Sequence, residues 1–336
     1  MSAPSRRIVV TRQRWYPSPP AVDLDLAELT QLIQPACPGA AVIERTPTEG
    51  GFANANYRLV LTGRTAPLLI RFFVRDAGAA PKEFALNKML VGRGLPVASY
   101  LHVALENPFT GHPFAVRDWT DGERLEIIAR DLTDEAMDRA GRSVGSVLAR
   151  IHAITFAQTG FFDAELHVAE PASMGSDGLV EFLTLCLVDG RGAQRIEPAV
   201  VRALLAFVER EGHILDEWRG SPCLVHSDFG GSNILMRRTD WRWEVASVLD
   251  WEFAFSGTPF FDFGNLLRPP LGQCPGFETA VVAGYRAGRG ALPDNWRKMS
   301  LLVDLYNWAD FLNRPQASAA IIADATARIE HTIAMW

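Results

Sequence analysis

Cysteine is scarce in this chain, which has only four among its 336 residues: Cys37, Cys186, Cys223 and Cys274. They are widely separated and form neither a Cys-x-x-Cys pair nor a cluster with histidine. Structural zinc sites and disulfide frameworks both need cysteines at short, recognisable spacings. The sequence therefore argues against both and favours four reduced thiols.

Long hydrophobic runs are absent as well. No stretch approaches the roughly 18 uninterrupted apolar residues of a membrane-spanning helix. Near the N-terminus a three-residue apolar run is surrounded by Arg6, Arg7, Arg12 and Arg14. Such a run is too short for the apolar core of a secretory signal. We therefore expect a cytoplasmic protein with no membrane partner.

The chain has no surplus of positive charge, since 33 Lys and Arg stand against 39 Asp and Glu. A net charge of −6 gives no indication of a nucleic-acid partner. The charge is uneven, however: residues 1–118 carry 13 basic and nine acidic residues, and residues 119–336 carry 20 and 30. The first part could bind an anionic phosphate ligand and the second a cationic one. Chance variation of the surface composition is the alternative.

The length and the residue pattern predict two lobes of different character. Runs of β-branched and aromatic residues predict strands at 41–43, 56–62, 67–74, 98–104 and 113–119. Helical patterns lie at 23–34, 81–92, 133–153, 178–188, 196–218, 276–287, 296–313 and 317–334, with a strand-rich segment at 223–262. Strands followed by helices indicate α+β architecture. We predict an N-terminal lobe over 1–118, with a helical extension, and a C-terminal lobe over 119–336.

The segment with the strongest chemical signal is LVHSDFGGSNIL, residues 224–235. Apolar residues lead into a polar loop in which Asp228 and Asn233 stand five positions apart. Seventeen residues beyond Asn233, a second apolar run ends in Asp250. Phosphoryl transfer uses one carboxylate to orient the attacking hydroxyl, and another carboxylate and an amide oxygen to hold magnesium. The pattern therefore indicates a phosphotransferase.

The same order of residues resembles that of aminoglycoside phosphotransferases and choline-kinase-like proteins. Those families carry H-G-D-x-x-x-x-N, then I-D-W or I-D-F, then G-D-P-x-x-D. This chain has HSDFGGSN, then LDWE, then GTPFFD, with Ser227 at the usual glycine. The resemblance extends from about residue 47 to residue 306. It implies a two-lobed protein-kinase-like fold, with a small antiparallel-sheet N-lobe containing one helix and a larger, mostly helical C-lobe.

The resemblance also implies roles for individual residues. Asp228 would be the catalytic base or hydroxyl-orienting group, and Asn233 and Asp250 would be magnesium ligands. His226 would brace the loop, and Asp262 would be a structural acid of the following turn. Glu252 lies close to this group in the sequence and is assigned no catalytic role.

On the nucleotide side, the loop TEGGFANANY resembles the family's phosphate-covering loop. Its candidate contacts are Gly50, Gly51, Phe52 and Asn54, because backbone N–H groups of small residues can close over phosphates. Gly50-Gly51 could equally form a plain hairpin turn. Segment 116–122 resembles the hinge that reads the nucleotide base.

A kinase-like protein usually pairs a lysine of the third strand with a helix glutamate. The matching residues here are Arg71 and Glu83, for which a plain surface ion pair is the alternative. Arginine keeps the positive charge and can bind phosphate and carboxylate with two donors. The change leaves the preference for ATP or GTP open.

The sequence thus predicts an ATP- or GTP-dependent, Mg²⁺-dependent kinase of a small hydroxylated molecule. The acidic C-terminal part favours a cationic acceptor of the aminoglycoside type, although choline, sugars, amino-acid alcohols and macrolides fit the motifs equally. A catalytically silent kinase-like binding module is the main alternative. A metal-dependent hydrolase would need more histidines, and a protein kinase would show an A-P-E segment after Asp250.

Overall fold

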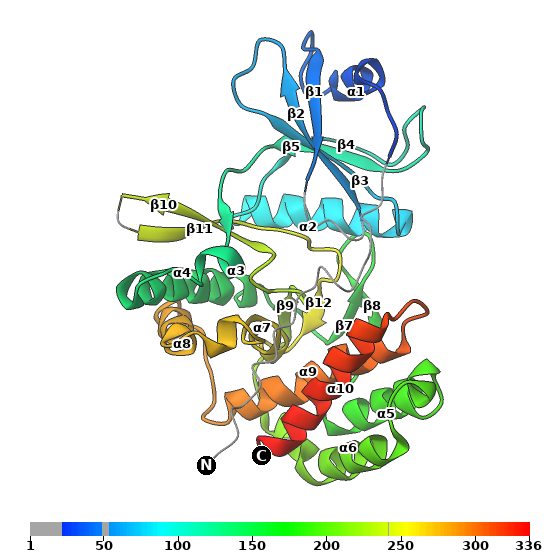
Figure 1. Ribbon diagram of the computed structural model, residues 1–336, viewed down its shortest axis with the longest axis vertical. Coiled ribbons are helices and arrows are strands. Elements are labelled where there is room, and N and C mark those ends of the chain that lie inside the picture. The colour runs from blue at the N-terminus through cyan, green and yellow to red at the C-terminus, as the bar shows by residue number, and fades with distance from the viewer. Residues whose placement is uncertain (1–21, 49–53, 241) are drawn as a thin grey trace.

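The computed structural model describes residues 22–48, 54–240 and 242–336. A small β-rich lobe stands above a larger, mostly helical lobe (Figure 1). Within the described residues, the upper lobe contains a five-stranded antiparallel sheet in the order β1-β2-β3-β5-β4. Its strands are β1 (Val42–Pro47), β2 (Ala55–Leu61), β3 (Leu68–Phe72), β4 (Tyr100–Ala104) and β5 (Phe114–Asp118).

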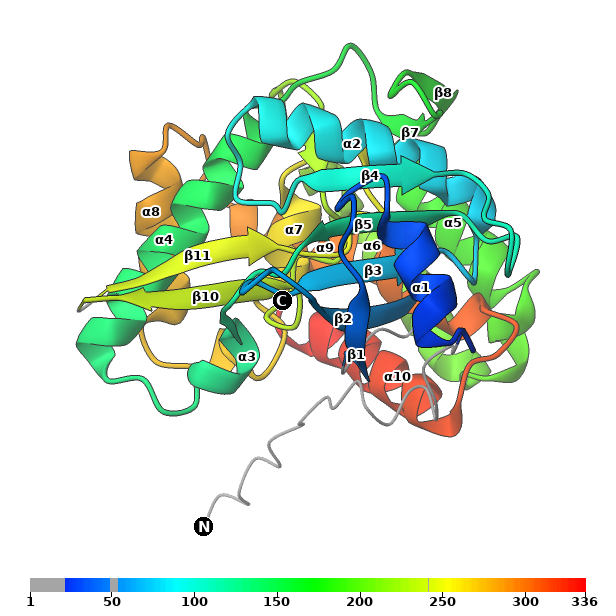
Figure 2. The ribbon, with the colours of Figure 1, turned by 90° about the horizontal axis from the view of Figure 1, so that it is seen from above.

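The burial pattern explains how this sheet is built. β2 alternates buried and half-buried residues, whereas all five residues of β3 are buried at the centre of the sheet. Helix α1 (Leu26–Ile33) packs beside β1 and buries Leu29, Leu32 and Ile33. Helix α2 (Ala80–Gly92) lies next to β4 (Figure 2). All of these elements agree with the sequence prediction within a few residues.

The C-lobe helices surround the second and larger hydrophobic core. They are α3 (Leu125–Ile128), α4 (Asp134–His152), α5 (Ser176–Leu187), α6 (Pro198–Glu211), α7 (Phe260–Leu266), α8 (Phe277–Ala287), α9 (Trp296–Asn313) and α10 (Ala319–Ala334). None of the helices in the described part of the chain has the length and apolar character needed to cross a membrane.

Two small sheets complete the C-lobe and position the site. One has the order β11-β10-β6, and the other has the order β8-β7-β12-β9. Their strands are β6 (Glu123–Arg124), β7 (Gly160–Phe162), β8 (Val168–Pro171), β9 (Cys223–Val225), β10 (Ile234–Thr239), β11 (Arg242–Val248) and β12 (Phe255–Gly257).

The structure differs from the sequence prediction at several elements, among them the unpredicted β6 and α3. The helix predicted over 196–218 ends as an α-helix at Glu211 and continues as a 3₁₀ turn over Gly212–Glu217. The strand-rich segment 223–262 already contains the start of α7, because the aromatic run Phe260-Phe261 packs as a helix in the core. The β7–β8 hairpin had no predicted counterpart.

Candidate active site

A hairpin brings Asn233 and Asp250 together although they are 17 residues apart. β10 begins directly after Asn233, and β11 pairs back along it until Val248. The backbone N–H of Leu249 donates to the carbonyl oxygen of Asn233 at 2.8 Å. Asp250 is therefore held one residue from this contact, so the spacing seen in the sequence is the length of a hairpin.

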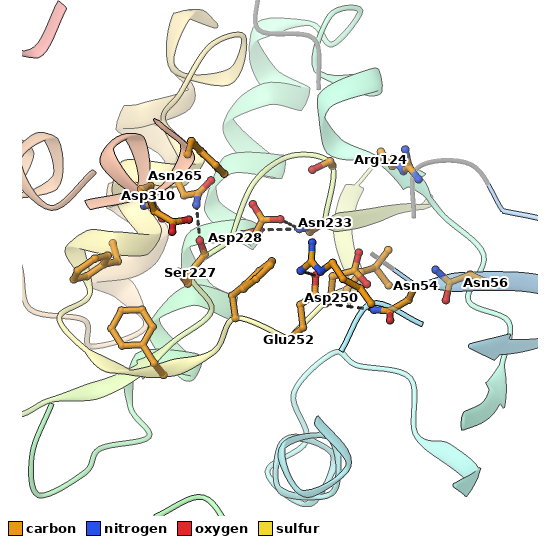
Figure 3. A pocket seen from close by; sticks show the side chains of 18 of the residues that line it. Asn54, Asn56, Arg124, Ser227, Asp228, Asn233, Asp250, Glu252, Asn265 and Asp310 are labelled. Carbon is orange, nitrogen blue, oxygen red and sulfur yellow. Dashed lines mark hydrogen bonds and ion pairs between the residues drawn. The ribbon is translucent and has the colours of Figure 1, made fainter. Parts of the chain in front are cut away.

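The loop after β9 carries Asp228. The amide nitrogen of Asn233 donates to the Asp228 carboxylate at 2.7 Å and to its backbone carbonyl at 2.9 Å. These bonds use the amide nitrogen of Asn233 and leave its oxygen for another ligand. Figure 3 shows Asp228, Asn233 and Asp250 facing one pocket. The three residues singled out in the sequence are thus brought together.

Two residues of the site have left-handed backbone conformations. Ser227 has φ 67° and Asp250 has φ 56°. Non-glycine residues adopt this region at a cost and concentrate at functional sites when surrounding contacts hold them. A left-handed conformation at Ser227 suits the glycine of the H-G-D motif that this segment resembles. Here Asn265 donates to the carbonyl oxygen of Ser227 at 2.7 Å and holds it.

His226 links the two segments that carry the acids. Its Nδ1 accepts from the backbone N–H of Asp228 at 3.2 Å, so its Nε2 carries the proton and donates to the carbonyl oxygen of Leu249 at 2.7 Å. The ring is fully buried. His226 therefore makes the bracing contacts expected of a positioning residue.

Asp262, in the first turn of α7, holds the backbone of the loop that carries Asp228. Its carboxylate accepts from the backbone N–H groups of His226 and Ser227, each at 2.9 Å. The same carboxylate lies 3.1 Å from Nε2 of His152, whose Nδ1 lies 3.0 Å from the Tyr285 hydroxyl. A buried carboxylate needs such partners. The chain of contacts connects the loop to α4 and α8.

Arg71 on β3 reaches two acids. Its guanidinium pairs with Glu83 of α2 at 3.3 Å and with Asp250, to which its Nη1 donates. Arg71 and Glu83 are both about 4% exposed, so their contact is a buried pair and the surface alternative is wrong. Tyr100 donates to the other oxygen of Glu83 at 2.9 Å.

These contacts determine the ionisation of Arg71 and Asp250. Burial lowers the pKa of Arg71, but the carboxylates of Glu83 and Asp250 outweigh it and keep that pKa raised. Desolvation acts to raise the pKa of Asp250, and the charge and hydrogen bond of Arg71 more than reverse this effect. Asp250 is therefore held as a carboxylate, the form that binds a hard cation.

Glu252 joins the two lobes beside this cluster. Its carboxylate accepts from Asn54 at 3.3 Å and from Arg75 at 3.3 Å, and Lys82 donates to its carbonyl oxygen at 2.8 Å. Burial raises the pKa of Glu252 to about 7, against the lowering effect of Arg71 and Arg75. The side chain lines the cleft, within reach of the site as its place two residues after Asp250 indicated, and it is paired.

The predicted phosphate-covering loop is described only in part. Gly50, Gly51 and Phe52 lie outside the described residues. Asn54 is buried and lines the cleft, and its contact with Glu252 points it toward the acids. The proposed hinge, residues 116–122, overlaps the end of β5 and also lines the cleft, through Arg117 to Thr120 and Gly122.

One cleft of about 2020 Å³ connects these groups. Its walls come from both lobes: β2, β3 and the hinge on one side, and α5, α7 and α9 on the other. Among the described residues, no three His, Cys, Asp or Glu side chains gather as a metal cluster. Mg²⁺ does not require one, because it binds one or two carboxylates together with substrate phosphates. Asp250 and the Asn233 amide oxygen fit that pattern.

The chain is similar to several known proteins. The mouse protein acyl-CoA dehydrogenase family member 10 is 25% identical over 215 residues, or 62% of this chain, and the chain spans only 18% of that protein. Two solved structures cover almost all of the chain. They are the GDP complex of wild-type aminoglycoside 2′-phosphotransferase-IIIa and the complex of a spectinomycin phosphotransferase with ADP and spectinomycin.

The first of these structures has a TM-score of 0.69 at 17% identity and covers 93% of this chain and 99% of its own. The second has a TM-score of 0.57 at 12% identity and covers 92% and 95%. The predicted protein-kinase-like fold is thereby confirmed. Residues 44–302 match the family model described as the phosphotransferase enzyme family, and the chain therefore belongs to that family.

Proposed function

We propose that this protein transfers the γ-phosphoryl group of ATP or GTP to a hydroxyl group of a small molecule. The observation that carries the proposal is the convergence of Asp228, Asn233 and Asp250 on one cleft between the lobes. Phosphoryl transfer depends mainly on positioning and on electrostatic stabilisation, and this arrangement offers both. The nucleotide complexes of the two structural neighbours support a nucleotide ligand.

Each residue then has a distinct task. Asp228 accepts or orients the proton of the attacking hydroxyl, and the amide nitrogen of Asn233 holds that carboxylate in place. Arg71 binds nucleotide phosphates while Glu83 fixes its direction. The phosphate-covering role predicted for Gly50 and Gly51 falls outside the described residues and stays a prediction. Asp262 and His226 support the loop without touching the substrates.

Magnesium fits the donor set, and the residues that would hold it are Asp250 and Asn233. Bound there, Mg²⁺ would supply positive charge against the phosphate oxygens. Arg71 already pairs with Asp250 in this structure and keeps it ionised. The cytoplasmic location predicted from the sequence remains a prediction.

The test is a comparison of the wild type with Asp228→Ala. We expect the variant to lose about 10²–10⁴-fold in Mg²⁺-dependent ADP or GDP release, the range for a general base. Nucleotide binding, measured by calorimetry, should persist because Asp228 does not hold the phosphates. Asp138→Ala is the matched control, since that acid forms an exposed pair with Arg142 on α4.

The outcomes distinguish an active phosphotransferase from a catalytically silent binding module. A silent binding module would release no nucleoside diphosphate in the wild type and would show no difference between the two variants. Turnover that survives Asp228→Ala would remove that residue from its proposed role.

A further inference from the structure

Five aromatic side chains form a continuous row along the C-lobe side of the cleft. Neighbouring rings in the row lie 5.1–5.6 Å apart between centroids. All five line the cleft, although they come from the five separate elements β7, β12, α7, α9 and α5. The row, called the aromatic wall below, consists in order of Phe161, Phe255, Phe261, Tyr306 and Phe182.

The aromatic wall passes directly beside the catalytic loop. Phe255 is the strand partner of Val225, three residues before Asp228. Phe261 precedes Asp262, whose carboxylate holds the backbone of that loop. A molecule lying on the wall would therefore have its near end at Asp228.

Part of this apolar surface is open to solvent. Phe161 is 49% exposed, Leu185 is 57% exposed and Phe253 is 38% exposed, and all three line the cleft. Large apolar side chains that gather at one concave surface mark a ligand site more often than scattered exposed residues do. Within the wall itself, Phe161 is exposed, Phe182 and Tyr306 are half-buried, and Phe255 and Phe261 are buried.

The helices beside the aromatic wall contribute few charges to the cleft, whereas Glu123 and Glu126 line it from β6 and α3. The acids that α5 and α9 contribute to the lining are Glu181 and Asp310. Arg314 pairs with Asp310 at 2.7 Å and so offsets its charge. Glu181 makes no ion pair with any other described residue. An ammonium group that lies against the aromatic wall would find Glu181 as the one carboxylate that α5 and α9 leave outside an ion pair among the described residues, so a body with several positive charges there would lose water without gaining enough partners.

We propose that the acceptor is a neutral or singly positive alcohol with an extended apolar body that contains rings. Its body stacks on the aromatic wall, and its hydroxyl points to Asp228. Stacking between flat rings and aromatic side chains favours such a body over a flexible polar one. The inference rests on the proposed phosphotransfer function and narrows its acceptor class away from the aminoglycoside type that the sequence favoured.

The transfer step balances as follows. The acceptor oxygen forms a bond to the γ-phosphorus as its proton passes to Asp228. The bond from the γ-phosphorus to the β–γ bridging oxygen breaks, and its electron pair leaves with the nucleoside diphosphate. The products are a phosphate ester and ADP or GDP.

The experiment compares three probes as acceptors with Mg²⁺ and either nucleotide: 2-phenylethanol, 2-(2-naphthyl)ethanol and kanamycin. The first two carry the same hydroxyl on one and two rings. We expect mass spectrometry to detect both phosphate esters, with kcat/KM about tenfold higher for the naphthyl alcohol because more apolar area is buried. Kanamycin should be the poorest acceptor. A higher kcat/KM for kanamycin than for the naphthyl alcohol would overturn the inference.

Two variants test the wall itself. Phe161→Ser should raise KM for the naphthyl alcohol by about tenfold and leave kcat nearly unchanged, because the lost contact is remote from the reacting atoms. Half of this side chain is exposed, so the variant should fold. Val188→Ser is the control: Val188 is 47% exposed just after α5 and lies outside the cleft lining. Equal KM values in Phe161→Ser and Val188→Ser would contradict the role of the wall.

Slow nucleotide hydrolysis separates this inference from the proposed function. Transfer to water does not use the wall, and it should occur in the wild type and fall to background in Asp228→Ala. If hydrolysis occurs and the naphthyl alcohol is not phosphorylated, the acceptor class is wrong. If hydrolysis and transfer are both absent, the phosphotransfer function itself fails.

Discussion

Arg71 connects three elements of the site because its guanidinium has donors on two sides. One side faces Glu83 on α2, and the other faces Asp250 after β11. A lysine carries a compact charge at a single nitrogen and could not bind both carboxylates with the same planar fork. The arginine therefore does more than replace the usual lysine: it also holds Asp250 ionised and in place.

Replacing this arginine should affect both stability and binding. Arg71→Met leaves the buried Glu83 without its cation, and breaking a buried pair in this way costs about 3–5 kcal/mol in free energy of unfolding. Nucleotide affinity should also fall by roughly tenfold or more, equivalent to at least about 1.4 kcal/mol. Urea denaturation and calorimetric titration with Mg²⁺-nucleotide measure the two effects.

The matched control is an arginine of the same lobe that makes an exposed pair. Arg64 contacts Asp118, and the two side chains are 33% and 54% exposed. Arg64→Met should change the free energy of unfolding by less than about 1 kcal/mol. Equal losses of free energy of unfolding in the two variants would show that the buried contacts of Arg71 stabilise the fold no more than the exposed Arg64–Asp118 pair does.

At the scale of elements, the contact between α4 and α8 supports the site from a distance. Tyr285 of α8 and His152 of α4 meet in the chain of contacts that ends at Asp262. The two helices approach closely because Gly145 presents no side chain. A Cβ at that position would lie 2.0 Å from the carbonyl oxygen of Val281. Only glycine allows this separation.

Gly145→Ala tests that contact. The added methyl group meets helix backbone that cannot move aside, so we expect the free energy of unfolding to fall by about 1–3 kcal/mol. Gly92→Ala is the control, because a Cβ at Gly92 of α2 has no atom within 4 Å. It should raise the free energy of unfolding by about 0.4–1 kcal/mol. Urea denaturation of both variants is the measurement, and an unchanged Gly145→Ala would contradict the close packing.

Elements that are local in sequence were the ones that could be predicted. The loop carrying Asp228 and Asn233 is one short motif, and Asp250 follows an apolar strand, so their spacing and its resemblance to a family pattern indicated their meeting. The aromatic wall could not be found this way, because Phe161, Phe182 and Tyr306 come from separate elements with no local signal. α7 was missed for a related reason: a short apolar run fits a buried strand and a buried helix equally well.

At the scale of the whole molecule, the lobes are joined through the groups that would hold the nucleotide. Arg71 of β3 contacts Asp250 of the C-lobe. Asn54, the residue directly before β2, donates a hydrogen bond to Glu252. Lys82 of α2 donates to the backbone at Glu252. A ligand that binds in the cleft therefore stabilises both lobes at once, and its effect should appear in the unfolding of the entire chain.

Thermal unfolding should report this coupling. A ligand that binds the folded chain alone at 100 times its dissociation constant adds about 2.7 kcal/mol to the free energy of unfolding. We expect ATP or GTP to raise the Tm in the presence of Mg²⁺, and to raise it much less when EDTA removes the metal. Asp250→Asn should lose most of this metal-dependent difference, because an amide is a weaker ligand for Mg²⁺ than a carboxylate. A difference equal to that of the wild type would mean that the metal is held elsewhere, since Asp250 is the acid that the hairpin places beside Asn233.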